Sequence, residues 1–206
     1  PGELHPIDSA AVGKWSEDWA DITDVALVGS MTLPYALLLT DSLLSDGSRA
    51  MTSFVADSSV VLESFLISNV AAVTLKYAIR RPRPTQYTDA APAETFGALE
   101  HQLSFPSGHT AAVGSAMSAT ALTYWLRHPD SPSRWIFVGG AAGLTTLTAV
   151  GRVQAGKHFP SDVFAGAVVG SAIGLAIPWL HRADQSVHSS IHWTPDSASV
   201  SFIGHF

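Results

Sequence analysis

The first group of residues whose types and spacing could do chemistry lies between Lys76 and Pro84. Lys76 and Arg83 are separated by almost two helical turns, so their side chains should point to nearly the same side, about 10 Å apart along the axis. Pro82 and Pro84 should end that helix. Two cations on one helix face suit the binding of an oxyanion. The alternative is a basic helix end that interacts only with its own dipole.

The second segment, residues 104–110, opens a run of small residues that is typical of a buried helix. Ser107 suits an N-cap, and the free N–H groups of the first helical turn favour a bound anion. Gly108 lets a ligand approach the backbone closely. His109 would then lie beside a bound phosphate and could donate a proton to it. A capped helix with an incidental histidine is the competing interpretation.

The third segment, residues 151–162, contains Arg152, His158 and Asp162. Arg152 offers a planar fork for phosphate oxygens. Asp162 follows His158 by four residues, and a carboxylate at that spacing can hold the Nδ1–H of the imidazole. Nε2 would then be free to act as a nucleophile or a base. Taken alone, a histidine that is merely hydrogen-bonded at a helix start explains the pattern equally well.

The three segments gain weight when they are considered together. They contain six of the 11 basic residues of the chain, namely Lys76, Arg80, Arg81, Arg83, Arg152 and Lys157. All three segments lie at expected helix ends, and antiparallel helices of similar length bring such ends together. We therefore expect the six cations to converge on one anion-binding pocket.

Composition limits the classes of protein that remain. A chain of 206 residues suits a single domain. The net charge of −6 disfavours nucleic acid as a partner, and the absence of cysteine excludes disulfide scaffolds and thiolate metal sites. With 47% hydrophobic and 14% charged residues, the chain is not disordered. No cluster of histidines and carboxylates has the spacing of metal ligands, so no metal is expected.

Apolar periodicity predicts an all-α fold, a compact helical bundle with the site at helix ends. Helices are expected at about 17–44, 50–80, 107–126, 135–150 and 160–180, and a functional loop at 85–105. Alternation in residues 198–202 predicts a short C-terminal strand. The single domain then comprises an N-terminal helical part (1–49), a catalytic helical core (50–182) and a C-terminal tail (183–206).

The apolar stretches leave the location of the protein open between two alternatives. Acidic residues interrupt the first half of the chain at short intervals, which favours a soluble domain over a compact membrane protein. The chain begins Pro1-Gly2-Glu3, as expected for an exported protein after signal-peptide removal or for a trimmed chain. We therefore expect a periplasmic or secreted protein, with an integral membrane protein as the alternative.

The three segments together resemble a known pattern. Lys-x6-Arg-Pro (76–84), Pro-Ser-Gly-His (106–109) and Arg-x5-His-x3-Asp (152–162) are similar to the three-part motif of the type 2 phosphatidic acid phosphatase superfamily. That superfamily also contains bacterial acid phosphatases and vanadium haloperoxidases. The resemblance covers about half of the chain, from Lys76 into the last helix. Gly151 departs from it, since family members often carry serine there, and we expect the loss of one hydrogen bond to phosphate.

The resemblance implies a helical bundle and metal-independent hydrolysis through a phosphohistidine. His158 would be the nucleophile, Asp162 its orienting carboxylate, and His109 the acid that protonates the leaving oxygen. The phosphate-binding groups would be those of Lys76, Arg83, Ser107, Gly108 and Arg152. No cofactor is expected, and vanadate should bind as a phosphate mimic.

The substrate stays open at this point. Phosphomonoesters and pyrophosphates, soluble or lipid-linked, present the same group to such a site, so the partner is a phosphorylated small molecule or a lipid phosphate. The tryptophans are compatible with contact with a membrane surface, and the oligomeric state is undetermined. Two other functions compete: a vanadium-dependent haloperoxidase, and a non-catalytic module that binds phosphate or lipid.

Overall fold

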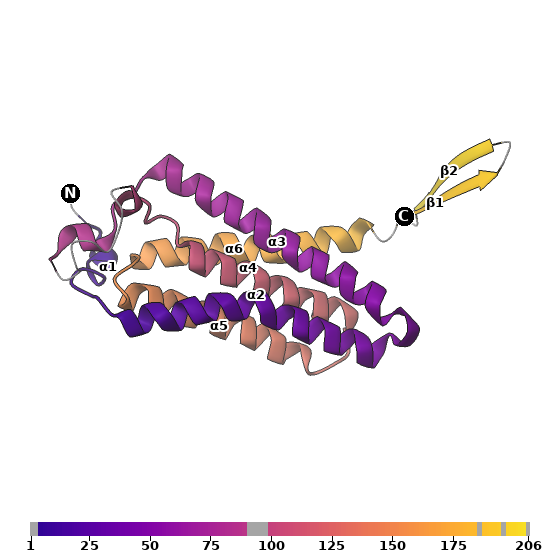
Figure 1. Ribbon diagram of the computed structural model, residues 1–206, viewed down its shortest axis with the longest axis horizontal. Helices are drawn as coiled ribbons and strands as arrows, with labels where there is room; N and C mark the ends of the chain where they lie inside the picture. The colour runs from indigo at the N-terminus through magenta and orange to yellow at the C-terminus, as the bar shows by residue number, and fades with distance from the viewer. Residues whose placement is uncertain (1–3, 90–98, 185–186, 195–196, 205–206) are drawn as a thin grey trace.

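The computed structural model describes residues 4–89, 99–184, 187–194 and 197–204, and it confirms the expected all-α bundle (Figure 1). The helices are α1 (Pro6–Ser9), α2 (Glu17–Ser45), α3 (Ala50–Ile79), α4 (Gly108–Arg127), α5 (Arg134–Gln154) and α6 (Pro160–Asp184). Short 3-10 turns connect them: η1 (Gly47–Arg49), η2 (Pro84–Tyr87) and η3 (Glu100–Gln102). The five long helices fall within a few residues of the ranges that periodicity predicted.

Helix α4 forms the core of the bundle, because most of its residues are small and buried. Helix α6 lies against α4 along a stripe of three glycines, where an added Cβ would come within 2.1–2.5 Å of a backbone carbonyl oxygen of α4. These pairs are Gly166 with Ser107, Gly170 with Ala111, and Gly174 with Ser115. Only glycine permits this separation of the two backbones, so the stripe fixes the start of α6 next to the start of α4.

The outer faces of the long helices are apolar. Four segments are long and apolar enough to cross a membrane, and only 22–28% of the residues in their most apolar windows are buried. They are Glu17–Ser45, Gly47–Tyr87, Arg134–Gln154 and Pro160–Arg182. Side chains such as Val25, Ile136 and Phe164 are more than 70% exposed. A water-soluble domain of this size would cover such surfaces.

Three of the acidic residues that interrupt the first half of the sequence do not interrupt this apolar exterior. Asp41, Asp46 and Asp57 all pair with Arg127 at the end of the bundle where α2, α3 and α4 meet. Asp24 and Asp41 of α2 are 17 residues apart, or about 26 Å of helix, close to the thickness of a bilayer core. The expectation of a soluble exported domain is therefore corrected, and the integral membrane alternative is supported.

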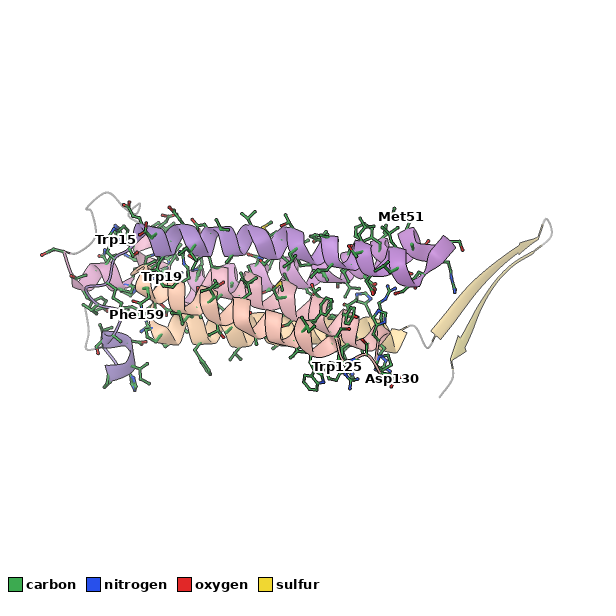
Figure 2. The ribbon with its side chains drawn as sticks, turned by 90° about the horizontal axis from the view of Figure 1, so that it is seen from below. Trp15, Trp19, Met51, Trp125, Asp130 and Phe159 are labelled. Atoms are coloured by element: carbon green, nitrogen blue, oxygen red, sulfur yellow. The ribbon has the colours of Figure 1, made fainter. Side chains whose placement is uncertain are left out.

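Tryptophans lie at both ends of the bundle, as they do at the two interfaces of membrane proteins. Trp15 and Trp19 lie at one end together with Phe159, and Trp125 lies at the other end beside Asp130 (Figure 2). Trp125 contacts Trp135 edge to face, with ring centroids 4.9 Å apart. This distribution agrees with the apolar belt between the two ends.

The expectations for the chain start and for the middle of the 85–105 loop fall outside the described residues, whereas the expected C-terminal strand lies within them. The start of the chain (1–3) and the middle of the expected 85–105 loop (90–98) are not described. In the tail, β1 (Val187–Thr194) and β2 (Ser197–Gly204) pair antiparallel, with Ile191 opposite Val200. The expected short strand at 198–202 lies within β2.

Candidate active site

The three segments that the sequence singled out meet at one end of the bundle (Figure 1). The first comprises the last turn of α3 and the residues after it, the second opens α4, and the third joins α5 to α6. Direct hydrogen bonds connect them. The Ser104 N–H donates to the Arg81 carbonyl at 3.0 Å, the Ser107 N–H donates to the Asp162 carbonyl at 2.9 Å, and Arg83 Nη1 donates to the Lys157 carbonyl at 2.8 Å. The expected convergence of these helix ends is confirmed.

His158 lies at the centre of this end, only 2% exposed. Its Nδ1 is 2.8 Å from the carbonyl oxygen of Ser104. A carbonyl can only accept a hydrogen bond, so this contact requires the proton on Nδ1 and leaves the lone pair on Nε2. The Asp162 carboxylate is 3.8 Å from the same Nδ1, which is beyond hydrogen-bond distance. The expectation that Asp162 holds the imidazole directly is therefore wrong.

Asp162 instead fixes the backbone and side chains around His158. Its fully buried carboxylate accepts hydrogen bonds from Ser104 Oγ at 2.5 Å and from the Phe159 N–H at 2.9 Å. Arg81 Nη1 donates to the other oxygen at 2.5 Å. Asp162 thus orients Ser104, whose carbonyl holds the imidazole, and Phe159, which follows His158 in the chain. The influence of the carboxylate on His158 is one step removed from what the four-residue spacing suggested.

The electrostatic environment keeps His158 neutral. Burial lowers the pKa of His158 well below 6.5, and the positive charges of Arg83, Lys76 and Arg152 lower it further. The three cations predicted to hold phosphate are therefore all close enough to act on this imidazole. Arg152 is 7% exposed, and its Nε has no hydrogen-bond partner among the described residues. A buried guanidinium with an unused donor is suited to an anionic ligand.

Arg81 does not belong to the cationic pocket. Its guanidinium donates to Asp8 at 2.6 Å and to Ser161 at 2.6 Å, in addition to Asp162, and its carbon lies 4.3 Å from the centre of the Phe159 ring. Burial alone would raise the pKa of Asp8, but the hydrogen bonds from Arg81 and Ser161 hold it below 3.8. Asp8 thus anchors α1 to the site, a role for which the sequence contains no signal.

Two more of the six cations differ from the expectation. Arg80 ends α3 in the left-handed conformation, with φ of 48°, and its side chain is exposed. The Lys157 ammonium lies 4.3 Å above the centre of the Trp15 ring. The expected convergence of six cations is corrected to Lys76, Arg83 and Arg152 around His158, with Lys157 at the edge. Arg80 and Arg81 follow the end of α3, where neighbouring side chains point in different directions, so counting cations along the sequence overstated the pocket.

The start of α4 has the expected geometry. Ser107 is the N-cap, and its Oγ accepts from the Thr110 N–H at 3.5 Å and from Thr110 Oγ1 at 3.0 Å. A Cβ added at Gly108 would be 3.6 Å from Lys76 Cε, so the lysine side chain lies against this glycine. Ser107 and Gly108 are therefore beside the cations, as the sequence predicted.

His109 has a partner that the sequence did not reveal. Its Nε2 is 2.8 Å from Asp24 Oδ1 of α2, and the same oxygen is 3.3 Å from Arg152 Nη1. Thr23 contributes as well, because its Oγ1 is 3.3 Å from Arg152 Nη1. The first eight residues of α2 include four carboxylates, those of Glu17, Asp18, Asp21 and Asp24. Nothing in their spacing shows which of them meets the site.

The glycine at position 151 has a packing explanation. A Cβ added there would lie 2.4 Å from Thr23 Cγ2 and 3.1 Å from Trp19 Cε3. Because position 151 has no side chain, α5 approaches α2 closely enough for Asp24 to reach Arg152. The departure from the family pattern therefore accompanies the contribution of α2 to the site.

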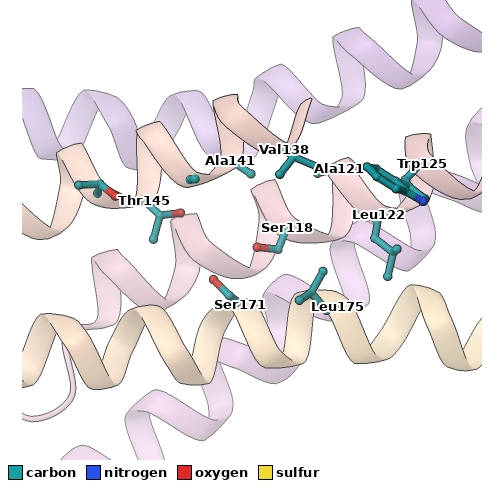
Figure 3. Close-up of a pocket in the computed structure, with 11 residues that line it drawn as sticks. Ser118, Ala121, Leu122, Trp125, Val138, Ala141, Thr145, Ser171 and Leu175 are labelled. Carbon is teal, nitrogen blue, oxygen red and sulfur yellow. The ribbon is translucent and has the colours of Figure 1, made fainter. Parts of the chain in front are cut away.

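The apolar pocket between α4, α5 and α6 is separate from this site. It measures about 320 Å³, and its wall includes Ser118, Trp125, Thr145, Ser171 and Leu175 (Figure 3). No residue of the three segments lines it. Among the described residues, no group of three or more histidines or carboxylates is arranged to hold a metal ion.

Comparison with known proteins decides the family. A family model described as the PAP2 superfamily matches residues 59–186, more than half of the chain and all three segments. The chain belongs to the PAP2 superfamily. The resemblance inferred from the three segments is thereby confirmed, and the polar network around His158 is the network of a PAP2 protein.

Curated members of the PAP2 superfamily align with most or half of the chain. A lipid A 1-phosphatase of Rhizobium johnstonii is 29% identical over 181 residues, covering 85% of this chain and 67% of that protein. An undecaprenyl-diphosphatase of Sulfolobus acidocaldarius is 32% identical over 110 residues, covering 53% of this chain and 48% of that protein. Both relatives are phosphatases by name.

The fold is also that of a solved PAP2 structure. A transmembrane PAP2 type phosphatidylglycerolphosphate phosphatase from Bacillus subtilis superimposes with a TM-score of 0.58 at 21% identity. The match covers 85% of this chain and 83% of that chain. This likeness confirms the helical fold.

Proposed function

We propose that this PAP2 protein is a membrane-embedded, metal-independent phosphatase that hydrolyses lipid-linked phosphomonoesters or diphosphates through a phosphohistidine at His158. The observation that carries the proposal is the His158 imidazole, buried and held at Nδ1 by the Ser104 carbonyl. This contact directs the lone pair to Nε2, the atom required for attack on phosphorus. Mere binding of phosphate does not need an oriented nucleophile.

The charges around His158 suit the transfer of a phosphoryl group. Lys76, Arg83 and Arg152 hold the three non-bridging oxygens, supplemented by Ser107 and the Gly108 N–H. Groups fixed in advance around these oxygens stabilise the transition state without further reorganisation. Because burial and the same cations depress its pKa, His158 stays unprotonated at neutral pH and keeps its lone pair.

The reaction then proceeds in two steps. Nε2 of His158 attacks phosphorus in line, the bond from phosphorus to the leaving oxygen breaks, and His109 gives that oxygen its proton. His109 next takes a proton from water, which attacks the phosphohistidine and releases phosphate. A lipid-linked substrate is supported by the apolar exterior, since a membrane around it would lie next to the site end of the bundle, and by the lipid substrate named for the Rhizobium relative.

The experiment is phosphate release from lipid and soluble phosphates by the full chain in detergent, combined with trapping of an acid-labile phosphoenzyme. We expect His158→Ala to abolish both, and His109→Ala to lower turnover by about 10²–10⁴-fold. His181→Ala is the matched control, since His181 pairs with Glu63 on the exposed surface, and it should retain full activity.

The competing functions predict different results from the same preparation. Vanadate should inhibit phosphate release as an analogue of the transferred group. Oxidation of halide by the vanadate-loaded protein with peroxide would instead identify a haloperoxidase. Tight phosphate binding without release from any substrate would indicate a binding module. Appreciable turnover by His158→Ala would disprove the phosphohistidine.

A further inference from the structure

The contact of Asp24 with His109 and Arg152 bears on the choice of substrate. Asp24 belongs to α2, which precedes all three segments, yet its Oδ1 is 2.8 Å from His109 Nε2 and 3.3 Å from Arg152 Nη1. A carboxylate thus lies against the histidine assigned as the acid and against one phosphate-binding arginine. The inference drawn from it rests on the proposed function, which sets the direction of the reaction.

Asp24 lies on the side of the site from which the leaving group departs. In an in-line transfer the leaving oxygen is opposite His158 and beside His109, the group that protonates it. The exposed fractions rise in the same direction. The side chains of His158 and Asp162 are 2% and 0% exposed, whereas those of His109 and Asp24 are 26% and 60% exposed. The site therefore opens toward Asp24, and the rest of the substrate must pass this carboxylate.

We propose that Asp24 is a specificity-determining residue that favours phosphomonoesters of uncharged alcohols over diphosphates. When a monoester is cleaved, the leaving group is a neutral alcohol. When a diphosphate is cleaved, the leaving group is itself a phosphate, and its negative charge lies next to the Asp24 carboxylate. Like charges at such a distance repel, so the diphosphate transition state is disfavoured relative to the monoester one.

The size of the effect is limited by solvent. Asp24 is largely exposed, and Arg152 and Lys157 both act on the same region, so water and these cations screen much of the repulsion. We expect removal of the charge to raise the ratio of kcat/KM for diphosphate to kcat/KM for monophosphate about tenfold. A tenfold change corresponds to about 1.4 kcal/mol.

The test compares farnesyl monophosphate with farnesyl diphosphate, which share one apolar group, using the full chain in detergent. Asp24→Asn removes the charge and retains an amide that can still contact His109, and Asp24→Ala removes both. Both variants should shift the ratio toward diphosphate by about tenfold. Asp21→Asn is the matched control, because Asp21 is exposed on the same helix one turn earlier, and it should leave the ratio within twofold of the unmodified protein.

Each alternative has its own signature. If Asp24 only positions His109, the variants slow the monophosphate, whose alcohol leaving group needs the proton, and do not speed up the diphosphate. A ratio that changes without a rise in kcat/KM for the diphosphate therefore overturns the inference. A shift toward monophosphate overturns it as well. A shift with Asp24→Ala alone would assign the effect to space rather than charge and would also refute it. Failure of the unmodified protein to release phosphate from either substrate would refute the proposed function itself, and thermal unfolding shows whether each variant is folded.

Discussion

Replacing Gly151 by serine, the residue frequent in the family, tests how α2 is joined to the site. The new Cβ would lie 2.4 Å from Thr23 Cγ2, about 1 Å inside the usual separation of two carbons. Thr23 cannot rotate freely to avoid it, because it is fully buried and its Oγ1 donates to the carbonyls of Trp19 at 3.0 Å and Ala20 at 2.8 Å. The clash must therefore push α2 away from α5.

The expected cost is that of overpacking a tight contact, about 1–3 kcal/mol of unfolding free energy. For a chain of this length, 2 kcal/mol lowers the melting temperature by about 4–8 °C. Phosphate release should fall in parallel, because Thr23 and the neighbouring Asp24 both contact Arg152. Thermal unfolding in detergent and phosphate release measure the two effects.

A double-mutant cycle identifies the atom responsible. Thr23→Ser removes Cγ2 but keeps the hydroxyl, so Gly151→Ser combined with Thr23→Ser should recover most of the lost stability. Gly143→Ser is the matched control, since Gly143 lies on the same helix and an added Cβ meets nothing within 4 Å. The explanation fails if Gly151→Ser is as stable as Gly143→Ser, or if Thr23→Ser brings no recovery.

Three further predictions concern the core and the charge network. Gly170→Ala should cost at least about 1–3 kcal/mol in thermal unfolding, because its Cβ would lie 2.1 Å from the Ala111 carbonyl oxygen; an unchanged melting temperature would contradict the close packing of α4 and α6. Asp162→Asn should cost about 1–3 kcal/mol of stability and lower phosphate release, because its NH2 group must face either Arg81 or the Ser104 and Phe159 donors; a stable and active variant would show that this network is dispensable. Because the pKa of His158 is lowered on folding, the unfolded chain binds a proton below about pH 6.5 that the folded protein does not. Stability should therefore fall as the pH drops from 7 to 5, and His158→Gln should remove this part of the slope; equal slopes for the two proteins would argue against a neutral His158.

The contacts of His158 and Asp162 show which features of the site the spacing of residues in the sequence can predict. The four-residue spacing correctly predicted that Asp162 lies near His158, since both flank the start of α6. It could not show that the intervening turn directs the carboxylate to the Phe159 N–H and to Ser104, because Ser104 is 54 residues away from His158 along the chain. The partner of a buried polar atom is chosen by whichever element packs against it.

The sequence by itself determined the features that depend on neighbouring residues. Apolar periodicity defined the five long helices, Pro82 and Pro84 ended α3, and Ser107 capped α4, because capping and chain termination are local interactions. The residue types around His158 also sufficed to indicate phosphate chemistry. These predictions needed no knowledge of how the helices are arranged.

Tertiary structure decided the features that depend on distant residues meeting. Arg81 was diverted to Asp8, Asp24 was brought to His109, and Asp41, Asp46 and Asp57 were gathered around Arg127 at the end of the bundle opposite the site. The apolar exterior followed from the same packing, since only the three-dimensional arrangement shows which face of each helix remains uncovered. The glycine contacts between α4 and α6 and at Gly151 set these distances, so the closeness of the helices, rather than any motif, decided which side chains complete the site.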